Sequence, residues 1–225
     1  MSHYFVYDPN KERRNYLVSG IIDGVRYELV TDEGIFSYKH FDYGTITLIE
    51  ALELDAEVKN VLDLGCGYGV IGLALKSKYA FIELTQTDIN LRAVELTREN
   101  AKRMSLESTV FVSDGYQKIS GKFDLITLNP PIKAGKETIF NLYLETFSHL
   151  TEKGSFYLVI KKKHGALSHL KYLKTIYKKV MIVKRNKGYY VIKAEKQWKL
   201  DWHIDKIVIK CLIAYIRFIL RKCGY

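Results

Sequence analysis

The sequence predicts an α/β fold built on a mostly parallel, doubly wound sheet. Two observations carry this prediction. From residue 60 onward, short apolar runs typical of buried strands alternate with longer stretches of helical character. The first of these runs ends in a glycine-rich turn. The length of 225 residues suits one ordinary domain with a small extension, and it is ample for a sizeable core.

The elements follow in order along the chain. In residues 1–50, aromatic and β-branched runs are broken by turn residues, beginning with Asp23-Gly24, which predicts a hairpin and a β-rich N-terminal extension. Strands are predicted at 61–64, 82–87, 109–112, 123–128 and 156–160, and helices at 70–78, 91–104, 138–150 and 166–177. Right-handed crossovers then place the loops that follow these strands along one edge of a Rossmann-like sheet, where ligands bind.

The last part of the chain predicts two further elements. The β-rich runs 180–183 and 189–192 are close enough to pair as an antiparallel hairpin at the edge of the sheet. In residues 197–225, basic side chains recur at helical spacing on one face and apolar residues fill the rest, which predicts a basic amphipathic helix. Packing on the sheet is the preferred role of this helix, ahead of dimerisation, RNA binding and contact with a membrane surface.

Composition excludes several classes of protein. With 48% hydrophobic and 27% charged residues, the chain is neither disordered nor collagen-like. Three scattered cysteines indicate a reducing compartment, and neither they nor the histidines have the spacing of metal ligands. The opening residues do not resemble a secretion signal, and the apolar stretch 207–220 is too short, at about 1.5 Å per residue, for a hydrocarbon core of about 30 Å. We therefore expect a soluble, cytoplasmic protein without stable membrane insertion.

Charge is distributed unevenly along the chain. The net charge is +10, yet residues 151–225 hold 19 basic and four acidic residues, whereas residues 1–150 hold 16 basic and 21 acidic ones. Such asymmetry indicates a face that binds a polyanion, and a lysine-rich solvated surface is the alternative.

A glycine-rich turn follows the first predicted strand of the sheet, in the sequence VLDLGCGYG. Gly65 and Gly67 allow a tight turn and a close approach of the backbone to a ligand. The residues from Gly67 onward formally match the pattern GxGxxG. In a dinucleotide site that pattern starts at the first glycine after the strand, which here is Gly65, so the match is out of register. Asp63, at the end of the strand, repels phosphate and favours a cationic amino group.

Two further carboxylates follow the next two strands. Asp88 lies 23 residues beyond Gly65, close to the offset of about 20 residues at which a carboxylate accepts two ribose hydroxyls. Asp114 comes after the third strand, where it can accept from an adenine amino group. Each of them alone is equally well explained as a helix cap or a turn residue. Together with Asp63 they place three carboxylates at successive strand ends.

Asn129, Pro130 and Pro131 follow the predicted strand at 123–128. Prolines cannot continue a strand or donate a backbone hydrogen bond, and they leave their carbonyls free as acceptors. An Asn oxygen and a proline carbonyl that converge on an NH2 group draw its lone pair out of conjugation, which makes the nitrogen nucleophilic without a strong base. An ordinary Asn-Pro turn is the alternative.

These motifs together resemble a class I S-adenosylmethionine-dependent methyltransferase that acts on amino nitrogen. More narrowly, the chain is similar to the methyltransferase small domain family, which includes guanine-N2 methyltransferases of 16S ribosomal RNA. The likeness covers about residues 3–194 and includes family-like features in 3–5, 31–37, 42–45, 129–136 and 188–191. It implies S-adenosyl-L-methionine as the cofactor, and the spacing of the histidines and cysteines predicts no metal.

The resemblance also implies roles for individual residues. Together with the residue pattern, it divides the chain into an N-terminal extension (1–50) over the cofactor site and a methyltransferase domain (51–196), followed by the C-terminal helix (197–225), which lies beyond the likeness. Asn129, Pro130 and Pro131 become the catalytic residues. The residues implied to bind the cofactor are Phe36, Ser37, Gly44, Thr45, Asp63, Gly65, Cys66, Gly67, Asp88, Ile89, Asp114 and Asn129.

Substrate contacts are expected in two places. Ile132 follows the two prolines, where many amino-methyltransferases carry Tyr or Phe to stack on the flipped base, so Phe36, Phe41 and Phe140 are the other candidates for stacking. Lys161, Lys162 and Lys163 precede a predicted helix, whose dipole disfavours cations at that end unless an anion such as an RNA phosphate is bound. Solvated lysines are the alternative.

The sequence thus favours an RNA methyltransferase, with N2 of a guanine in 16S ribosomal RNA as the target and ribosomal RNA or the small ribosomal subunit as the partner. Methylation of adenine N6 or of a protein glutamine amide is a second hypothesis, because an Asn-Pro-Pro corner serves any planar NH2 group. A non-catalytic RNA-binding factor of ribosome assembly is a third. A nicotinamide dehydrogenase is the weakest, and the sequence leaves open whether the protein is a monomer or a homodimer.

Overall fold

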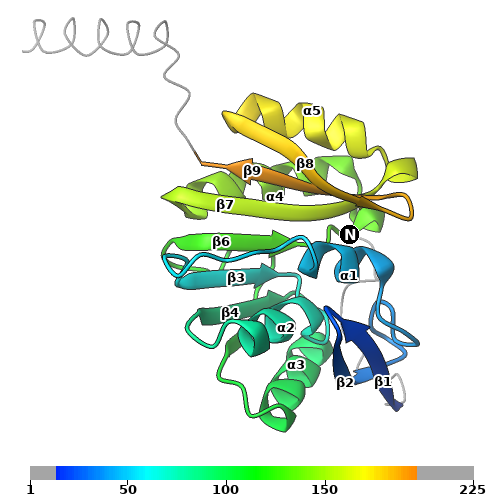
Figure 1. The fold of residues 1–225 in the computed structure, drawn as a ribbon. Helices are drawn as coiled ribbons and strands as arrows, with labels where there is room; N and C mark the ends of the chain where they lie inside the picture. The colour runs from blue at the N-terminus through cyan, green and yellow to red at the C-terminus, as the bar shows by residue number, and fades with distance from the viewer. Residues whose placement is uncertain (1–13, 197–225) are drawn as a thin grey trace, which may run out of the picture.

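The computed structural model describes residues 14–196. It contains a sheet of seven strands in the order β5-β4-β3-β6-β7-β9-β8 and a separate two-stranded hairpin (Figure 1). Within the large sheet β9 is antiparallel to both of its neighbours, and the other pairs are parallel. The prediction of a mostly parallel sheet with an antiparallel hairpin at one edge is therefore confirmed.

The predicted elements agree with the structure to within a few residues, except that β7 is much longer. The strands are β1 (Asn15–Ile22), β2 (Val25–Asp32), β3 (Asn60–Leu64), β4 (Glu83–Asp88), β5 (Thr109–Val112), β6 (Phe123–Leu128), β7 (Leu150–Lys161), β8 (Lys179–Asn186) and β9 (Tyr189–Glu195). The helices are α1 (Tyr43–Ile49), α2 (Val70–Lys78), α3 (Leu91–Arg103), α4 (Lys136–His149) and α5 (Ala166–Ile176), with short 3-10 helices η1 (Ile132–Ala134) and η2 (Lys162–His164).

Helices cover both faces of the sheet (Figure 1). Alternate residues of one strand point to opposite faces, as β7 illustrates. Tyr157 and Val159 pack in the core beneath α1, α2 and the hairpin, whereas Phe156 and Leu158 pack in the core beneath α4 and α5. The central strands β3 and β6 are thus buried on both faces, which explains why they are mostly apolar.

The hairpin of β1 and β2 closes through a two-residue turn at Asp23 and Gly24, as predicted. Both residues have positive φ, 48° and 77°, which is the geometry that matches the twist of paired strands. The second hairpin, β8–β9, closes in the same way at Lys187 and Gly188, with φ of 43° and 80°. Strand β8 therefore extends to Asn186, through residues that the sequence pattern places in the connection.

Helix α1 is absent from the sequence prediction. Residues 43–49 are rich in β-branched side chains and fall within the predicted β-rich extension, yet they form a helix capped by the side chain of Asp42, which accepts from Thr45 N at 3.0 Å. Leu48 and Ile49 of this helix share one core with the hairpin and the sheet. Residues 14–50 are therefore packed continuously with the sheet, and the proposed boundary at residue 50 stays a prediction.

A fully buried asparagine ties the hairpin to the sheet. Asn100 of α3 accepts from Val30 N at 2.7 Å, and its amide donates to Val30 O at 2.8 Å and to Tyr68 O at 2.9 Å. It thereby connects β2 to the glycine-rich turn. None of the helices between residues 14 and 196 is long and apolar enough to cross a membrane. The predicted helix at 197–225 lies outside the described residues.

Loss of the hydrogen bonds that the Asn100 side chain makes should destabilise the whole fold. We expect Asn100→Ala to lower the free energy of unfolding by about 2–4 kcal/mol, because it leaves three buried backbone groups without partners. Denaturant unfolding measures this change, with Asn141→Ala on the exposed face of α4 as the control, which should shift stability by less than about 0.5 kcal/mol. Equal effects of the two substitutions would contradict this account.

Candidate active site at the carboxyl ends of the parallel strands

Three adjacent strands end level with one another and assemble the candidate site. Leu64, the last residue of β3, pairs with Thr87 of β4 on one side and with Leu128 of β6 on the other. The residues that follow these positions are Gly65, Asp88 and Asn129, so three predicted site residues meet at one edge of the sheet.

The glycine-rich turn has the open geometry that a ligand-binding loop requires. Gly65 and Gly67 have φ of 71° and 60°, a region that side chains rarely adopt. A Cβ at Gly67 would meet nothing within 4 Å, and one at Gly65 would meet only a methyl group of Leu128 at 3.9 Å. The turn is fixed at its base because Gly65 N and Cys66 N both donate to Thr87 O, at 2.8 and 2.9 Å. Its outer surface is left clear for a ligand.

Asp88 stabilises this turn from the neighbouring strand. Its Oδ2 accepts from Gly67 N and its Oδ1 from Asn90 N, both at 2.9 Å. Burial raises the pKa of Asp88, and the backbone N–H groups of Asn90, Gly67 and Ile89 oppose that effect. The two carboxylate oxygens together have about four acceptor positions, more than these backbone donors occupy.

Asp63 lies beneath the turn and has no exposed surface. Its Oδ2 accepts from Gly72 N at 3.0 Å and from Gln86 Nε2 at 3.3 Å, and its Oδ1 accepts from Thr127 Oγ1 at 3.1 Å. Burial raises the pKa of this carboxyl to about 6, against the opposing effect of these donors. The structure therefore gives Asp63 a visible role in holding α2 to the sheet, and its contact with a cofactor stays a prediction.

Cys66 is buried within the turn. Its Sγ lies 3.5 Å from Thr97 Oγ1, and burial raises the pKa of the thiol well above its usual value. The side chain packs in this position and is not poised to react. Within the described part of the chain, no group of three His, Cys, Asp or Glu side chains is arranged to hold a metal ion.

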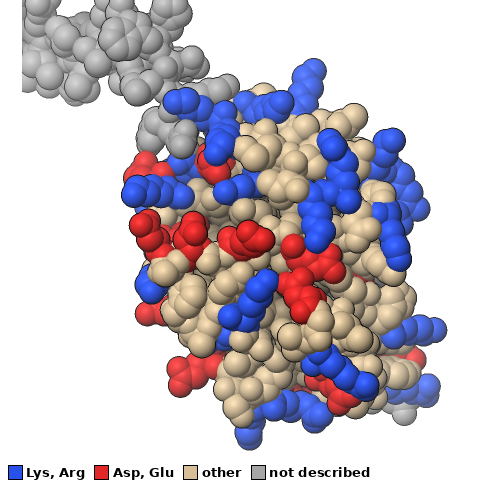
Figure 2. All heavy atoms as spheres, viewed as in Figure 1, with Lys and Arg blue, Asp and Glu red and all other residues tan. Residues whose placement is uncertain are grey.

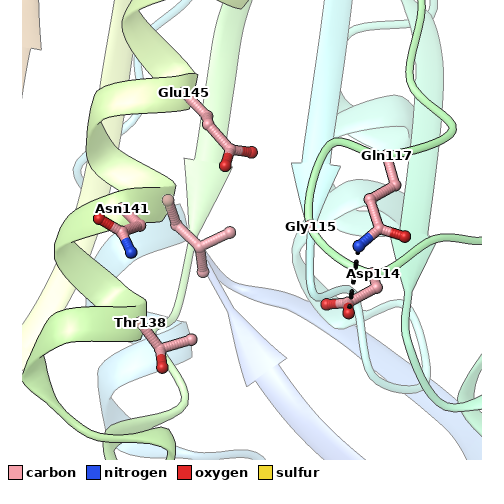
Figure 3. A pocket seen from close by; sticks show the side chains of 7 residues that line it. Asp114, Gly115, Gln117, Thr138, Asn141 and Glu145 are labelled. Atoms are coloured by element: carbon pink, nitrogen blue, oxygen red, sulfur yellow. Dashed lines mark hydrogen bonds between the residues drawn. The ribbon is translucent and has the colours of Figure 1, made fainter.

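A pocket of about 190 Å³ lies beside Asp114. Figure 3 shows the loop that carries Asp114, Gly115 and Gln117 facing α4, from which Thr138 and Asn141 approach. Gln117 Nε2 donates to Asp114 Oδ2 at 3.5 Å, a long hydrogen bond that a better donor can replace. Several of the residues that line the pocket have polar side chains, which can form hydrogen bonds to the edge of a heterocycle.

The Asn129-Pro130-Pro131 corner has two acceptors that receive no hydrogen bond from residues 14–196. Pro131 O accepts from Ala134 N at 2.9 Å as η1 begins, so it is occupied. No residue of the described chain donates to Pro130 O or to Asn129 Oδ1. Asn129 is half-buried and Pro130 is buried, and Ile132 just beyond them is 37% exposed.

The amide nitrogen of Asn129 is held from the N-terminus of α1. It donates to Thr45 Oγ1 at 3.0 Å and to Asp42 Oδ2 at 3.3 Å. Tyr189 OH donates to the other oxygen of Asp42 at 3.2 Å. Gly44 makes this close packing possible, because a Cβ there would lie 2.8 Å from both Asp42 Oδ2 and the Tyr189 ring.

Sequence reasoning assigns Gly44 and Thr45 to the cofactor and misses Asp42 and Tyr189. Both missed residues stand in segments that carry the family resemblance. The signal that could have found Asp42 is its position as a helix-capping aspartate, three residues before Thr45.

The aromatic residues named for base stacking differ in exposure. Phe41 is buried in the core, and Phe140 stacks on Tyr172 with ring centroids 3.9 Å apart. Phe36 is 59% exposed, and the carbonyl of the next residue, Ser37, accepts from Tyr68 OH at 3.3 Å. Of the three phenylalanines, only Phe36 has an open ring, and it lies close in the chain to the contact between Ser37 and the glycine-rich turn.

Cations gather next to the Asn129 corner. A shallow hollow of about 430 Å³ is lined by Lys161, Lys162, Lys163 and Gly188. Among the described residues no carboxylate forms an ion pair with these lysines, and Lys161 Nζ lies 5.0 Å from the centre of the Tyr189 ring. On the face shown in Figure 2, basic side chains gather mainly around α5 and the β8–β9 hairpin, and acidic ones form a band across the middle.

The chain is similar to several known proteins. A family model described as "methyltransferase small domain" matches residues 26–193. The uncharacterized protein YbxB of Bacillus subtilis is 34% identical over 197 residues, which cover 86% of this chain and 98% of that protein. Ribosomal RNA small subunit methyltransferase C of Pasteurella multocida is 38% identical over 130 residues, which cover 56% of this chain and 39% of that enzyme.

One solved structure is similar over most of the fold. It is the T. thermophilus 16S rRNA N2 G1207 methyltransferase (RsmC) in complex with AdoMet and guanosine, with a TM-score of 0.74 and 26% identity. The alignment covers 84% of this chain and 52% of that one. This chain therefore spans about half the length of the solved enzyme and about two fifths of the Pasteurella enzyme.

The burial of Asp63 predicts a measurable dependence of stability on pH. Its pKa in the fold, about 6, exceeds the unfolded value of 3.8, so the free energy of unfolding falls as the pH rises through this interval. Asp63→Asn mimics the protonated carboxyl. We expect this variant to match the wild type near pH 4 and to be more stable at pH 8, by on the order of 1–3 kcal/mol.

Denaturant unfolding of both proteins at the two pH values provides the test. The difference between them should grow with pH, because only the wild type must bury a carboxylate. A difference that is the same at pH 4 and pH 8 would show that Asp63 is not titrating in this interval.

Proposed function

The chain belongs to the methyltransferase small domain family, and we propose that it methylates an exocyclic amino group, N2 of a guanine in 16S ribosomal RNA. Family membership confirms the resemblance drawn from the sequence motifs. S-adenosyl-L-methionine is the cofactor that this membership indicates, because the solved relative binds AdoMet. The target base and the RNA partner are proposals.

A single observation carries the choice of an amino group as the target. Asn129 Oδ1 and Pro130 O are two acceptors without donors among the described residues, and they stand one strand away from the glycine-rich turn. An NH2 group that donates to both acceptors is held in place and keeps its lone pair out of conjugation. The rate enhancement then comes from position and electrostatics, with no strong base required.

The residues at the strand ends fit the cofactor. When bound, S-adenosylmethionine supplies an electrophilic methyl group on a sulfonium sulfur. We assign its amino-acid part to the open turn at Gly65 and Gly67, its ribose to the remaining acceptor positions of Asp88, and its adenine amino group to Asp114. Ile89 is 38% exposed beside Asp88 and offers apolar surface to the same ligand.

Two observations favour RNA as the substrate. Relatives over about half of this chain are named ribosomal RNA small subunit methyltransferase C, and the solved relative is in complex with guanosine. In this chain the Lys161 ammonium lies over the ring of Tyr189, and Tyr189 bonds to the same carboxylate that holds Asn129, so cations stand close to the acceptor corner. We propose that Lys161, Lys162 and Lys163 bind phosphates that flank the target nucleotide.

The activity is tested by incubating the protein and labelled S-adenosylmethionine with RNA and with ribosomal subunits from a strain that lacks the gene. Transfer of label to a nucleoside that is identified as N2-methylguanosine supports the proposal. Transfer of label to adenine N6 or to a protein glutamine would show that the proposed target is wrong, while methyl transfer to an amino group would stand. No transfer to any of these acceptors, by protein that binds the cofactor, would overturn the function.

Substitutions in the acceptor corner should change turnover, whereas substitutions among the cofactor-binding residues should change cofactor affinity. Asn129→Ala should lower kcat by about 10²–10³-fold and leave the Kd of the cofactor unchanged, because we assign its Oδ1 to the target amine and not, as the resemblance also implies, to the cofactor. Asp88→Ala should raise that Kd by about 10–100-fold, because it removes charge-assisted hydrogen bonds to the ribose. Calorimetry and initial rates separate the two effects. Full turnover by Asn129→Ala would remove the proposed role of this residue.

Replacement of Lys161, Lys162 and Lys163 by alanine should weaken RNA binding and flatten its salt dependence. For every phosphate that is no longer neutralised, the slope of log Kd against log salt should fall by about 0.9 if the RNA is double-stranded there and about 0.7 if it is single-stranded. The matched control replaces Lys102, Arg103 and Lys118, which are exposed at the opposite, β5 edge of the sheet and carry the same charge. Equal slopes for the two triple variants would show that only net charge matters.

A further inference from the structure

A carboxylate from outside the predicted site controls the acceptor that the proposed function uses. We propose that Asp42 is a positioning residue: it fixes the Asn129 amide with its NH2 group turned inward and Oδ1 turned toward the target amine. The inference rests on the proposed function and adds to it a residue to which no role in the chemistry was assigned.

Chemistry settles which way the Asn129 amide faces. The oxygen and nitrogen of an amide have nearly the same shape, so the orientation follows from the partners. Asp42 Oδ2, 3.3 Å from Asn129 Nδ2, can only accept, and Thr45 Oγ1 supplies a second acceptor at 3.0 Å. The opposite orientation would place the amide oxygen against a carboxylate and repel it. The NH2 group therefore faces Asp42, and Oδ1 is left on the other side.

Asp42 is itself held rigidly enough to impose this orientation. Its Oδ2 accepts from Thr45 N at 3.0 Å and its Oδ1 from Tyr189 OH at 3.2 Å. The two donors come from α1 and β9, and Asn129 comes from the end of β6. One carboxylate thus joins three segments that are far apart in the sequence.

The negative charge of Asp42 also matches the needs of the reaction. A charge-assisted hydrogen bond to Nδ2 polarises the amide and makes Oδ1 a stronger acceptor. In the transfer, the target nitrogen would form a bond to the methyl carbon while the bond from that carbon to the sulfonium sulfur breaks, and the sulfur would leave as a neutral thioether. The nitrogen becomes more positive as this happens, and its N–H groups become stronger donors, before one proton passes to water. Asp42 therefore supports, through Asn129, the charge that develops at the target amine.

A purely structural role is the competing explanation, because Asp42 caps α1. The variants Asp42→Ser and Asp42→Asn separate the two roles. Serine caps a helix about as well as aspartate but is too short to reach Asn129 as well. Asparagine also caps, and its side-chain oxygen can still accept from Thr45 N and from Asn129 while its NH2 group donates to Tyr189 OH. The two variants thus differ in their hydrogen bonds with Asn129 and with Tyr189, and of these only the bond with Asn129 sets the orientation of the acceptor Oδ1.

We expect Asp42→Ser to lower kcat by about 10–100-fold, with the Kd of the cofactor changed less than twofold. Asp42→Asn should recover only part of that decrease, because it restores the hydrogen bond that orients Asn129 but not the negative charge. In a protein that already carries Asn129→Ala, Asp42→Ser should have no further effect on kcat, because the group through which it acts is gone. Wild-type turnover by Asp42→Ser, or independent decreases in the double variant, would overturn the proposal.

A control excludes a drop in stability as the cause. Asp124 lies at the other end of β6, is half-buried like Asp42, and accepts from Lys59 N, Asn60 N and Thr151 Oγ1, each at 3.0 Å. Asp124→Ser should lower Tm and leave kcat unchanged. If it lowered kcat as much as Asp42→Ser does, the effect at Asp42 would be structural and the proposal would fail.

A second measurement does not depend on turnover. In 15N-labelled protein, the side-chain NH2 signal of Asn129 is assigned by its absence from Asn129→Ala. We expect its protons to exchange slowly with water in the wild type and much faster in Asp42→Ser. An unchanged signal would overturn the proposal. The exchange could be slow in the wild type and faster in Asp42→Ser, as expected, while the wild type methylates none of the tested acceptors. That combination would overturn the proposed function and leave the hydrogen bond between Asp42 and Asn129 established.

Discussion

The parallel pairing of β3 between β4 and β6 is the constraint on which the site depends. Because Leu64 is in register with Thr87 and with Leu128, the backbone leaves the sheet at the same level on three strands. The open glycine turn, the carboxylate of Asp88 and the Asn-Pro-Pro corner therefore meet without any long loop to position them. A slip of two residues in the pairing of β3 with β6 would shift the acceptor half of the site from the cofactor half by roughly 7 Å, and the same slip between β3 and β4 would shift Asp88 from the glycine-rich turn.

Buried and half-buried carboxylates give this edge its rigidity. Asp63 holds α2 from beneath, Asp88 holds the turn from the side, and Asp42 holds Asn129 from α1. In each case backbone N–H groups or neutral side chains supply the donors among the described residues. Hydrogen bonds of this kind are directional, so they fix geometry in a way that an ion pair with a long lysine does not.

Local sequence patterns predict the strands, the second hairpin and the glycine turn, because each follows from short-range periodicity and turn chemistry. Helix α1 escapes such patterns because 43–49 contains residues that favour strands, and its helical state is imposed by the Asp42 cap and by packing of Leu48 and Ile49. The hydrogen bond between Asp42 and Asn129 joins residues 87 apart, which no local pattern can reveal. Burial of Asp63 is likewise a property of the assembled sheet.

The central claim is that Asn129 Oδ1 and Pro130 O receive the amino group of the target base. A crystal structure of this protein with guanosine and the demethylated cofactor tests it most directly. The account predicts the exocyclic nitrogen within about 3.2 Å of both oxygens, with the Asn129 NH2 group still directed at Asp42. A base bound with its amino group elsewhere, or with Asn129 turned the other way, would contradict it.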